Sequence, residues 1–329
     1  MDGTKPTIYD VAQRCGVAAS TVSRTFSHPS RVNPATREKV RAAAEEIGYL
    51  PRPLARAEAP GRTRTITLVV TDIANPYYVP LIKAAQSQAL EKDYTLALTD
   101  SDESPHVEAS NLRQLLATTS GAILATSRLS DDVIRQIAEH RPLVIVNREI
   151  EGIPSLVVDT AGGMRKAVRH LAAIGHRRIA YLAGPRNSWI NSARWRAMKD
   201  ESGSLGLDAT FLGPHVPNVQ GGHEAADALM LERATAAIAY NDLIAIGALQ
   251  RVQAAGVSVP ADFSLIGCDD IFGSDLTSPG LTTIAGPTER LGRSAVDALH
   301  AQLTHHARID PTLFDAHLVT RGSTGAPRA

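Results

Sequence analysis

The sequence is poor in cysteine, in aromatic residues and in long apolar runs, and each shortage excludes a class of protein. Cys15 and Cys268 are the only cysteines among 329 residues and form no CxxC pair, which excludes a disulfide framework and a cysteine-based zinc motif. No apolar run approaches the length of about 18 residues that a membrane span needs, and the start of the chain lacks the pattern of a signal segment. We therefore expect a soluble cytoplasmic protein with no membrane partner. Aromatics make up only 4% of residues, so the core must be built from Ala, Leu, Val and Ile.

Signature motifs of common enzymes are also missing. The sequence has no GxxxxGK[ST], HExxH or GxSxG, and His223-Glu224 is not followed by the second histidine of a zinc motif. His300, His305 and His306 have a spacing that does not bring them to one helix face. We therefore expect no catalytic residues, no metal and no cofactor, with an enzyme as the less favoured alternative.

The net charge is zero, but it is unevenly divided along the chain. Residues 1–64 carry 11 Lys and Arg against 6 Asp and Glu, while the remainder carries 23 against 28. A basic head on an acidic body indicates that the head alone meets a polyanion.

Short helices are predicted in this basic head. Thr7 and Asp10 have the spacing of a capping box, and Gly16 can end the first helix because glycine tolerates the left-handed conformation. Val22 and Phe26 are four residues apart, which places them on one inner face of a second helix.

This arrangement predicts a helix-turn-helix unit. The second helix spans about residues 19–26, and a third begins at Asn33-Pro34, an N-cap residue followed by proline. In such a unit the second helix lies in the major groove of DNA. Its outward residues are small, apart from one long donor: Ala19, Ser20, Thr21, Ser23 and Arg24. The alternative is a small helical domain whose polar face meets only water.

From Thr65 onward, short apolar strands alternate with helices. The predicted strands include residues 66–70, 94–99, 121–125, 142–147, 178–184, 236–241 and 263–270. Two successive sets of these units predict two doubly wound parallel-sheet subdomains with a cleft between them. The predicted fold class is thus a small all-α helix-turn-helix head plus an α/β core.

Ligands of doubly wound sheets bind beyond the carboxyl ends of the strands. This rule selects residues 72–78, 100–103, 147–148, 159, 184–189, 241–242 and 269–270. Their carboxylates, amides, guanidinium groups and aromatic rings suit a polyol such as a sugar. The alternative is that many of these groups cap helices, which is favoured for Asp72, Asp242 and Asp270.

Several runs of the head carry a family resemblance: TIYDVA from residue 7, GVAASTVSR from residue 16, VNPATREKV from residue 32 and IGYLP from residue 47. The head resembles that of the LacI family of bacterial transcription regulators. The resemblance implies a helix-turn-helix DNA-binding domain at residues 1–50, a hinge at 51–64 and an effector-binding and dimerisation domain at 65–329. It divides the last into subdomain one, about 65–160 plus 290–315, and subdomain two, about 161–289 plus 316–325.

The resemblance implies double-stranded operator DNA as a partner, and hence association with the nucleoid when the protein is bound. Ala19, Ser20 and Arg24 match base readers, and Thr7, Ser23, Ser27 and Thr36 match phosphate contacts. The full expected DNA-binding set is Thr7, Tyr9, Ala19, Ser20, Thr21, Ser23, Arg24, Ser27, Arg31, Asn33, Thr36 and Arg56.

For the core, the resemblance implies a periplasmic-binding-protein-like fold, a carbohydrate effector and a homodimer that represses transcription. No leucine heptads follow residue 300, so no tetramer-forming coiled coil is expected. The expected effector-binding residues are Asn75, Tyr77, Tyr78, Asn147, Arg148, Asp159, Arg196, Asn241 and Asp269.

A few positions depart from the family pattern. Ala18 stands where a capping serine is usual, at a cost of about 1 kcal/mol of local stability. Glu58 replaces a leucine that wedges into the minor groove, and Pro60 would shorten a hinge helix. The run VPNVQGG from residue 216 and Gly286 remove side chain from the expected cleft. The cleft would then suit a bulkier ligand, a weakly held ligand or a ligand that is not a sugar. The alternative function is a ligand sensor of the same fold with weakened DNA binding, which needs a corepressor or a protein partner.

Overall fold

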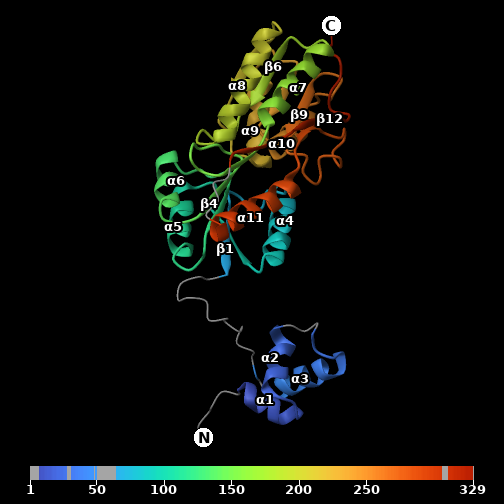
Figure 1. Ribbon diagram of the computed structural model, residues 1–329. Helices are drawn as coiled ribbons and strands as arrows, with labels where there is room; N and C mark the ends of the chain where they lie inside the picture. Colours follow the sequence, from blue (N-terminus) through green and yellow to red (C-terminus); the bar gives the residue numbers. More distant parts are fainter. Residues whose placement is uncertain (1–6, 28–30, 48, 50–63, 306–309, 329) are drawn as a thin grey trace. The chain divides into compact units, whose positions relative to one another are not determined.

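The computed structural model describes residues 7–27, 31–47, 49, 64–305 and 310–328. The chain divides into two compact units, Met1–Arg62 and Thr63–Ala329, called here the head and the core (Figure 1). In the described segments no helix is long and apolar enough to cross a membrane.

The head consists of α1 (Ile8–Cys15), α2 (Ala19–Ser27) and α3 (Pro34–Glu46). Each helix contributes one fully buried valine to a common core: Val11, Val22 and Val40. Gly16 has φ +63°, the left-handed conformation that ends α1 and starts the tight turn into α2. Three short helices around so small a core form the predicted helix-turn-helix unit.

Local capping fixes the starts of two of these helices. The Asp10 carboxylate accepts hydrogen bonds from the backbone N–H and the hydroxyl of Thr7, both at 2.7 Å. Asn33 Oδ1 accepts from the Ala35 N–H at 2.9 Å and so caps α3. Before α2, the carbonyl of Ala18 accepts from the N–H groups of Thr21 and Val22, but alanine has no side-chain oxygen to cap the helix.

The first sheet of the core has the order β11-β5-β4-β3-β1-β2 with parallel pairing throughout. Its strands are β1 (Thr65–Val70), β2 (Thr95–Asp100), β3 (Ala122–Ala125), β4 (Leu143–Val146), β5 (Ser155–Val158) and β11 (Thr312–Phe314). Its helices are α4 (Tyr78–Glu91), α5 (Pro105–Leu115), α6 (Asp131–Ala138) and α11 (Thr288–His305). Leu68 packs with the α4 and α11 side chains, and its neighbour Val69 packs with those of α5 and α6. Both faces of the sheet are therefore covered (Figure 1).

The second sheet has the order β12-β10-β9-β8-β6-β7, and only β12 runs antiparallel to its neighbour in this set of described strands. Its strands are β6 (Arg178–Leu182), β7 (Asp208–Leu212), β8 (Ala236–Ala239), β9 (Ser264–Cys268), β10 (Thr282–Ala285) and β12 (His317–Val319). Its helices are α7 (Thr160–Ala173), α8 (Trp189–Ser204), α9 (Val219–Leu229) and α10 (Asp242–Ala254). The predicted fold class, a helical head plus two doubly wound subdomains, is confirmed.

The chain passes between the two sheets at β5 to α7, at β10 to α11 and at β11 to β12. Helix α11 therefore packs on α4 of the first sheet although it follows a strand of the second. These three connections join the two subdomains of the core. Such a junction allows the two walls of the cleft to open and close.

Candidate functional site

The outer face of α2 carries the head's candidate DNA-reading residues. Ser20 and Arg24 are exposed and stand four residues apart on one helix face, while Val22 and Thr25 are buried. Ala19, Thr21 and Ser23 are half-buried at the margins of that face. The helix thus presents one long donor among short side chains, which permits close approach to base edges.

The remaining DNA-contact candidates fall into three groups. Tyr9 and Arg31 are exposed, and Thr36 is half-buried. Both donors of Thr7 are engaged by Asp10, and Asn33 caps α3, so these two residues already have structural roles in the head. The side chain of Ser27, together with Arg56, Glu58 and Pro60, lies outside the described residues.

The core holds a cleft between the carboxyl ends of its two sheets, as the strand-end rule predicts. The space between its side chains amounts to about 540 Å³, the open side included. Its lining residues come from both subdomains: Asn75, Tyr77, Tyr78, Glu103, Thr126, Arg128, Asn147, Val158, Thr160, Ile190, Arg194, Pro217, Tyr240, Asn241, Asp269, Ile284, Gly286 and Thr288. A mixed polar and apolar lining at the carboxyl ends of two doubly wound sheets is typical of a small-molecule site.

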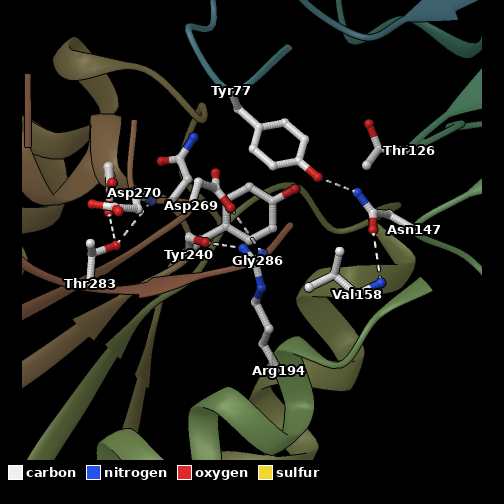
Figure 2. Close-up of polar contacts among 12 residues, drawn as sticks. Tyr77, Thr126, Asn147, Val158, Arg194, Tyr240, Asp269, Asp270, Thr283 and Gly286 are labelled. Atoms are coloured by element: carbon white, nitrogen blue, oxygen red, sulfur yellow. Dashed lines mark hydrogen bonds and ion pairs between the residues drawn. The ribbon is translucent and has the colours of Figure 1, made fainter. Parts of the chain in front are cut away.

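The first wall carries Tyr77 and Tyr78 at the start of α4, and Figure 2 shows the contact of Tyr77 with Asn147. Asn147 Nδ2 donates to the Tyr77 hydroxyl at 2.6 Å, and Asn147 Oδ1 accepts from the Val158 N–H at 3.3 Å. Burial raises the pKa of the Tyr77 hydroxyl above its usual range, so the group stays protonated. Asn147 donates to the oxygen of the Tyr77 hydroxyl, so the proton of this hydroxyl can be donated to a ligand in the cleft.

Arg128, after β3, is the cation of the first wall. Its Nε and Nη2 donate to the two carboxylate oxygens of Glu103 at 2.6 and 3.1 Å, and its Nη1 donates to the Thr126 carbonyl at 2.9 Å. Its side chain is only 2% exposed. This bidentate pair holds the guanidinium at the cleft, where Nη2 also reaches the Tyr240 hydroxyl of the second wall at 3.4 Å.

The second wall is organised around Arg194 of α8. Its Nη1 donates to the Tyr240 carbonyl, its Nη2 donates to Asp269 Oδ1 at 3.2 Å, and its guanidinium lies 5.2 Å from the centre of the Tyr240 ring (Figure 2). The Nε of Arg194 is buried and has no partner among the described residues. Burial raises the pKa of the Asp269 carboxyl to about 7, against the opposing effect of Arg194.

Of the nine predicted effector residues, Asn75, Tyr77, Tyr78, Asn147, Asn241 and Asp269 line this cleft. Two of the amides also have structural roles. Asn75 Oδ1 accepts from the Tyr77 N–H, and Asn241 caps α10 while donating to the Pro217 carbonyl. These two strand-end amides thus line the cleft and also hold local structure, so both predicted interpretations apply to them.

Arg196, Arg148 and Asp159 do not line the cleft. Arg196 is exposed, because two residues along a helix turn its side chain away from Arg194, which takes the cleft position instead. Arg148 is buried against the Ser127 and Leu129 carbonyls and the Asp131 carboxylate. Asp159 Oδ1 caps α7 through the Gly162 N–H at 2.7 Å. The structure thus places these three predicted residues outside the lining of the cleft.

Gly286 was expected to enlarge the cleft, and this expectation is wrong in its simple form. A Cβ built on Gly286 would lie 2.5 Å from Val158 Cγ1, so the space of a side chain is already filled by Val158. Val158 itself lines the cleft. The space beside Gly286 is therefore occupied by the apolar side chain of Val158 and is not empty volume.

The predictions missed Thr126, Arg128, Arg194 and Tyr240. The strand-end rule could have predicted Arg128, because it follows β3. Arg194 could not be predicted without knowing which face of α8 is turned toward the cleft. Within the described segments no group of three or more His, Cys, Asp or Glu could hold a metal ion.

Comparison with known proteins defines the class to which this architecture belongs. A family model described as bacterial regulatory proteins, lacI family, matches residues 7–52, and one described as a periplasmic binding protein-like domain matches residues 168–324. The chain is 32% identical over 335 residues to the HTH-type transcriptional repressor CytR of Escherichia coli strain K12, covering 98% of this chain and 97% of the relative. It is also 32% identical to the HTH-type transcriptional regulator DegA of Bacillus subtilis strain 168, covering 88% of each.

Solved structures agree with this class. The lac repressor dimer bound to operator and the anti-inducer ONPF superposes with a TM-score of 0.82 at 28% identity, covering 98% of this chain and all of the other. A complex of the transcriptional regulator CelR with cellobiose gives 0.72 at 28% identity, covering 97% and 99%. The protein is a transcriptional regulator with a DNA-binding head and a ligand-binding-type core. It belongs to the LacI family.

Proposed function

We propose that the protein is a sequence-specific transcriptional repressor whose affinity for operator DNA is set by a small molecule in the cleft of the core. The observation that carries this proposal is the pairing of two sites in one chain. One is an exposed face of α2 with Ser20 and Arg24, and the other is a buried cleft with Arg128 and Arg194 on opposite walls. A ligand that prefers one degree of cleft closure shifts the equilibrium between the two states.

The proposed effector is a carbohydrate or a close derivative. The cleft offers hydroxyl, amide, carboxylate and guanidinium groups beside apolar Ile190, Val158 and Ile284, which suits a molecule with both polar edges and apolar faces. The structural relatives solved with cellobiose and, from Enterococcus faecium, with ribose support this chemistry by analogy.

A homodimer is the proposed assembly, and one apolar surface of the core supports it. Val79, Phe272 and Leu276 are large exposed hydrophobics, and Phe272 is 85% exposed. Val79 and Phe272 line a broad hollow together with Pro76, Pro80 and other residues beside the junction of the subdomains. Two copies related by a two-fold axis would cover this surface and present two heads to a near-palindromic site.

The second candidate is a ligand sensor of the same fold with weakened DNA binding. Its support in the described residues is Ala18, which leaves the start of α2 without a side-chain cap. Such a protein would need a corepressor or a protein partner to act on transcription.

A DNA titration separates the two candidates. The purified protein is titrated against DNA from immediately upstream of its own gene and against random DNA, at two salt concentrations, because affinity without salt dependence is not interpretable. Tight, sequence-selective and salt-sensitive binding supports the repressor. Weak and unselective binding that no added ligand rescues contradicts it.

A further inference from the structure

Arg196, displaced from the cleft, lies beside a different hollow on the outer side of the second subdomain. This hollow measures about 920 Å³, its open side included. It is called here the α8 groove and is lined by Arg186, Asn191, Ser192, Trp195, Arg196, Lys199, Asp200 and Phe211. Ser192, Arg196 and Lys199 follow one another at helical spacing, so α8 presents them as a single stripe.

The groove carries an excess of cations. Arg186, Arg196 and Lys199 are exposed, and none of them has an ion-pair or hydrogen-bond partner among the described residues, while Asp200 is the one carboxylate in the lining. Two other arginines of this subdomain are paired instead, Arg169 with Glu201 at 2.7 Å and Arg251 with Asp227 at 2.7 Å. Three unpaired cations beside a single carboxylate make the α8 groove favourable for an anionic partner.

The floor of the groove is aromatic. Trp195 stacks on Tyr181 with ring centres 5.9 Å apart, and Phe211 meets Trp195 edge-on at 5.3 Å. Tyr181 is fully buried, whereas Phe211 remains 39% exposed. The exposed part of Phe211 offers an apolar contact that is fixed in place by the ring beneath it.

Phe211 also belongs to a strand at the edge of the second sheet. Strand β7 is the last in the order β12-β10-β9-β8-β6-β7 and pairs with β6 on one side. Its outer side is a row of backbone donors and acceptors that an extended segment can pair with. Arg186, Arg196 and Lys199 would repel the same groove of a second copy of this chain. They therefore favour an acidic segment as the strand that pairs with the edge of β7.

We propose that the α8 groove and the outer edge of β7 form a docking site for an extended acidic segment of a partner protein. The segment adds to β7 as a further strand, places an apolar residue on Phe211 and directs carboxylates at Arg196, Lys199 and Arg186. The site lies outside the lining of the ligand cleft, so the segment and the effector occupy different surfaces of the protein.

The test uses a labelled ten-residue peptide, titrated against the full-length protein by fluorescence anisotropy. Glu and Val alternate along one face of the peptide strand and Thr occupies the other face, because successive side chains of a strand point to opposite sides. Arg196→Glu/Lys199→Glu should weaken binding at least tenfold, and Phe211→Ser should weaken it as well. The matched control is Arg113→Glu/Arg293→Glu, which reverses two exposed arginines of the first subdomain and should leave binding within twofold. An equal loss of peptide affinity in both double variants would show that binding depends only on the overall charge of the protein, which would overturn the proposal.

Backbone methylation of the peptide tests strand addition itself. Methylating one alternate set of amides should abolish binding and methylating the other set should spare it, because only one edge of a strand pairs with β7. Tolerance of both sets, or no binding of the unmodified peptide, overturns the proposal. The operator titration of Arg196→Glu/Lys199→Glu should match wild type, so failure of the docking site and failure of the repressor function are distinguishable.

Discussion

Arg128 and Tyr240 stand on opposite walls of the cleft, and Nη2 of the arginine lies 3.4 Å from the hydroxyl of the tyrosine. The same hydroxyl is 3.1 Å from Ser188 Oγ of its own subdomain. Tyr240 also contacts Arg194 through its carbonyl and its ring. One tyrosine thus connects the buried arginines of both walls, and a ligand that separates the walls must replace this contact.

Removing the hydroxyl tests this connection. Tyr240→Phe should lower the free energy of unfolding of the core by about 1 kcal/mol, because Ser188 loses a buried hydrogen-bond partner. Hydrogen exchange at residues 126–130 should become faster as the walls separate more often. Tyr94→Phe is the control, since it removes a hydroxyl that lies 3.4 Å from His300 within the first subdomain. Unchanged exchange at residues 126–130 in Tyr240→Phe would contradict a contact that holds the cleft closed.

Asp269 should make the stability of the core depend on pH. Its folded pKa of about 7 exceeds the unfolded value near 4, so the native state binds the additional proton between these values. Its contribution to stability is therefore full below about pH 4 and is lost as the pH rises toward 7. Urea unfolding, followed by the fluorescence of Trp189 and Trp195 in the second subdomain, should show this loss in wild type. Asp269→Asn should remove that part of the slope, and an identical slope in the variant would rule out the assignment.

The packing of Gly286 against Val158 predicts a compensating pair. Gly286→Ala should destabilise the core by about 1–3 kcal/mol, because the added methyl must displace Val158. Val158→Ala/Gly286→Ala should recover most of that loss, since the first change removes the obstructing methyl groups. Additive losses in the double variant, measured by urea unfolding, would show that the two positions do not share the space.

Arg24 is expected to read sequence rather than to supply charge alone. Arg24→Ala should cost roughly 1–3 kcal/mol on specific DNA and should relax base preference at one position. Arg14→Gln is the control, because Arg14 is an exposed arginine of the same head that pairs with Glu46 on α3. Equal losses for Arg24→Ala on specific and random DNA would remove this residue from base readout.

The head also offers a gain-of-stability test. Ala18→Ser should stabilise the head by about 1 kcal/mol, because a serine oxygen can accept from backbone N–H groups of the first turn of α2. Thermal unfolding monitored by head-specific NMR signals measures the change. An unaltered or lower melting temperature would show that the start of α2 does not need a side-chain cap.

The sequence predicted the architecture well because hydrophobic periodicity is a local property. The alternation of apolar strands and helices from Thr65, and the glycine and capping signals of the head, both correspond to observed elements. Five strands were not predicted individually: Ser155–Val158, Asp208–Leu212, Thr282–Ala285, Thr312–Phe314 and His317–Val319. The last two have only three residues each, which carry too little periodicity, and their pairing depends on distant strands. The location of the cleft could also be predicted, because the ends of the strands follow from the same local hydrophobic pattern.

The failures concern side-chain direction. Arg194 and Arg196 differ by two positions in one helix, and only the packed structure sets which of them turns inward. Arg148 and Arg128 both follow strands of the first sheet, yet Arg148 is held by carbonyls and Asp131 while Glu103 keeps Arg128 at the cleft. Such choices depend on partners far away in sequence, which local patterns do not record.

The most direct test of the central claim is the linkage between the cleft and the head. Pentoses, hexoses, disaccharides and sugar derivatives are first screened for binding by tryptophan fluorescence, and a molecule that binds wild type but not Arg194→Ala is taken as a cleft ligand. The affinity for DNA from upstream of the gene is then measured with and without it. The account predicts that the ligand changes this affinity at least fivefold in wild type, with no change for random DNA or for Arg194→Ala. A ligand that fills the cleft and leaves operator affinity unchanged would contradict the account.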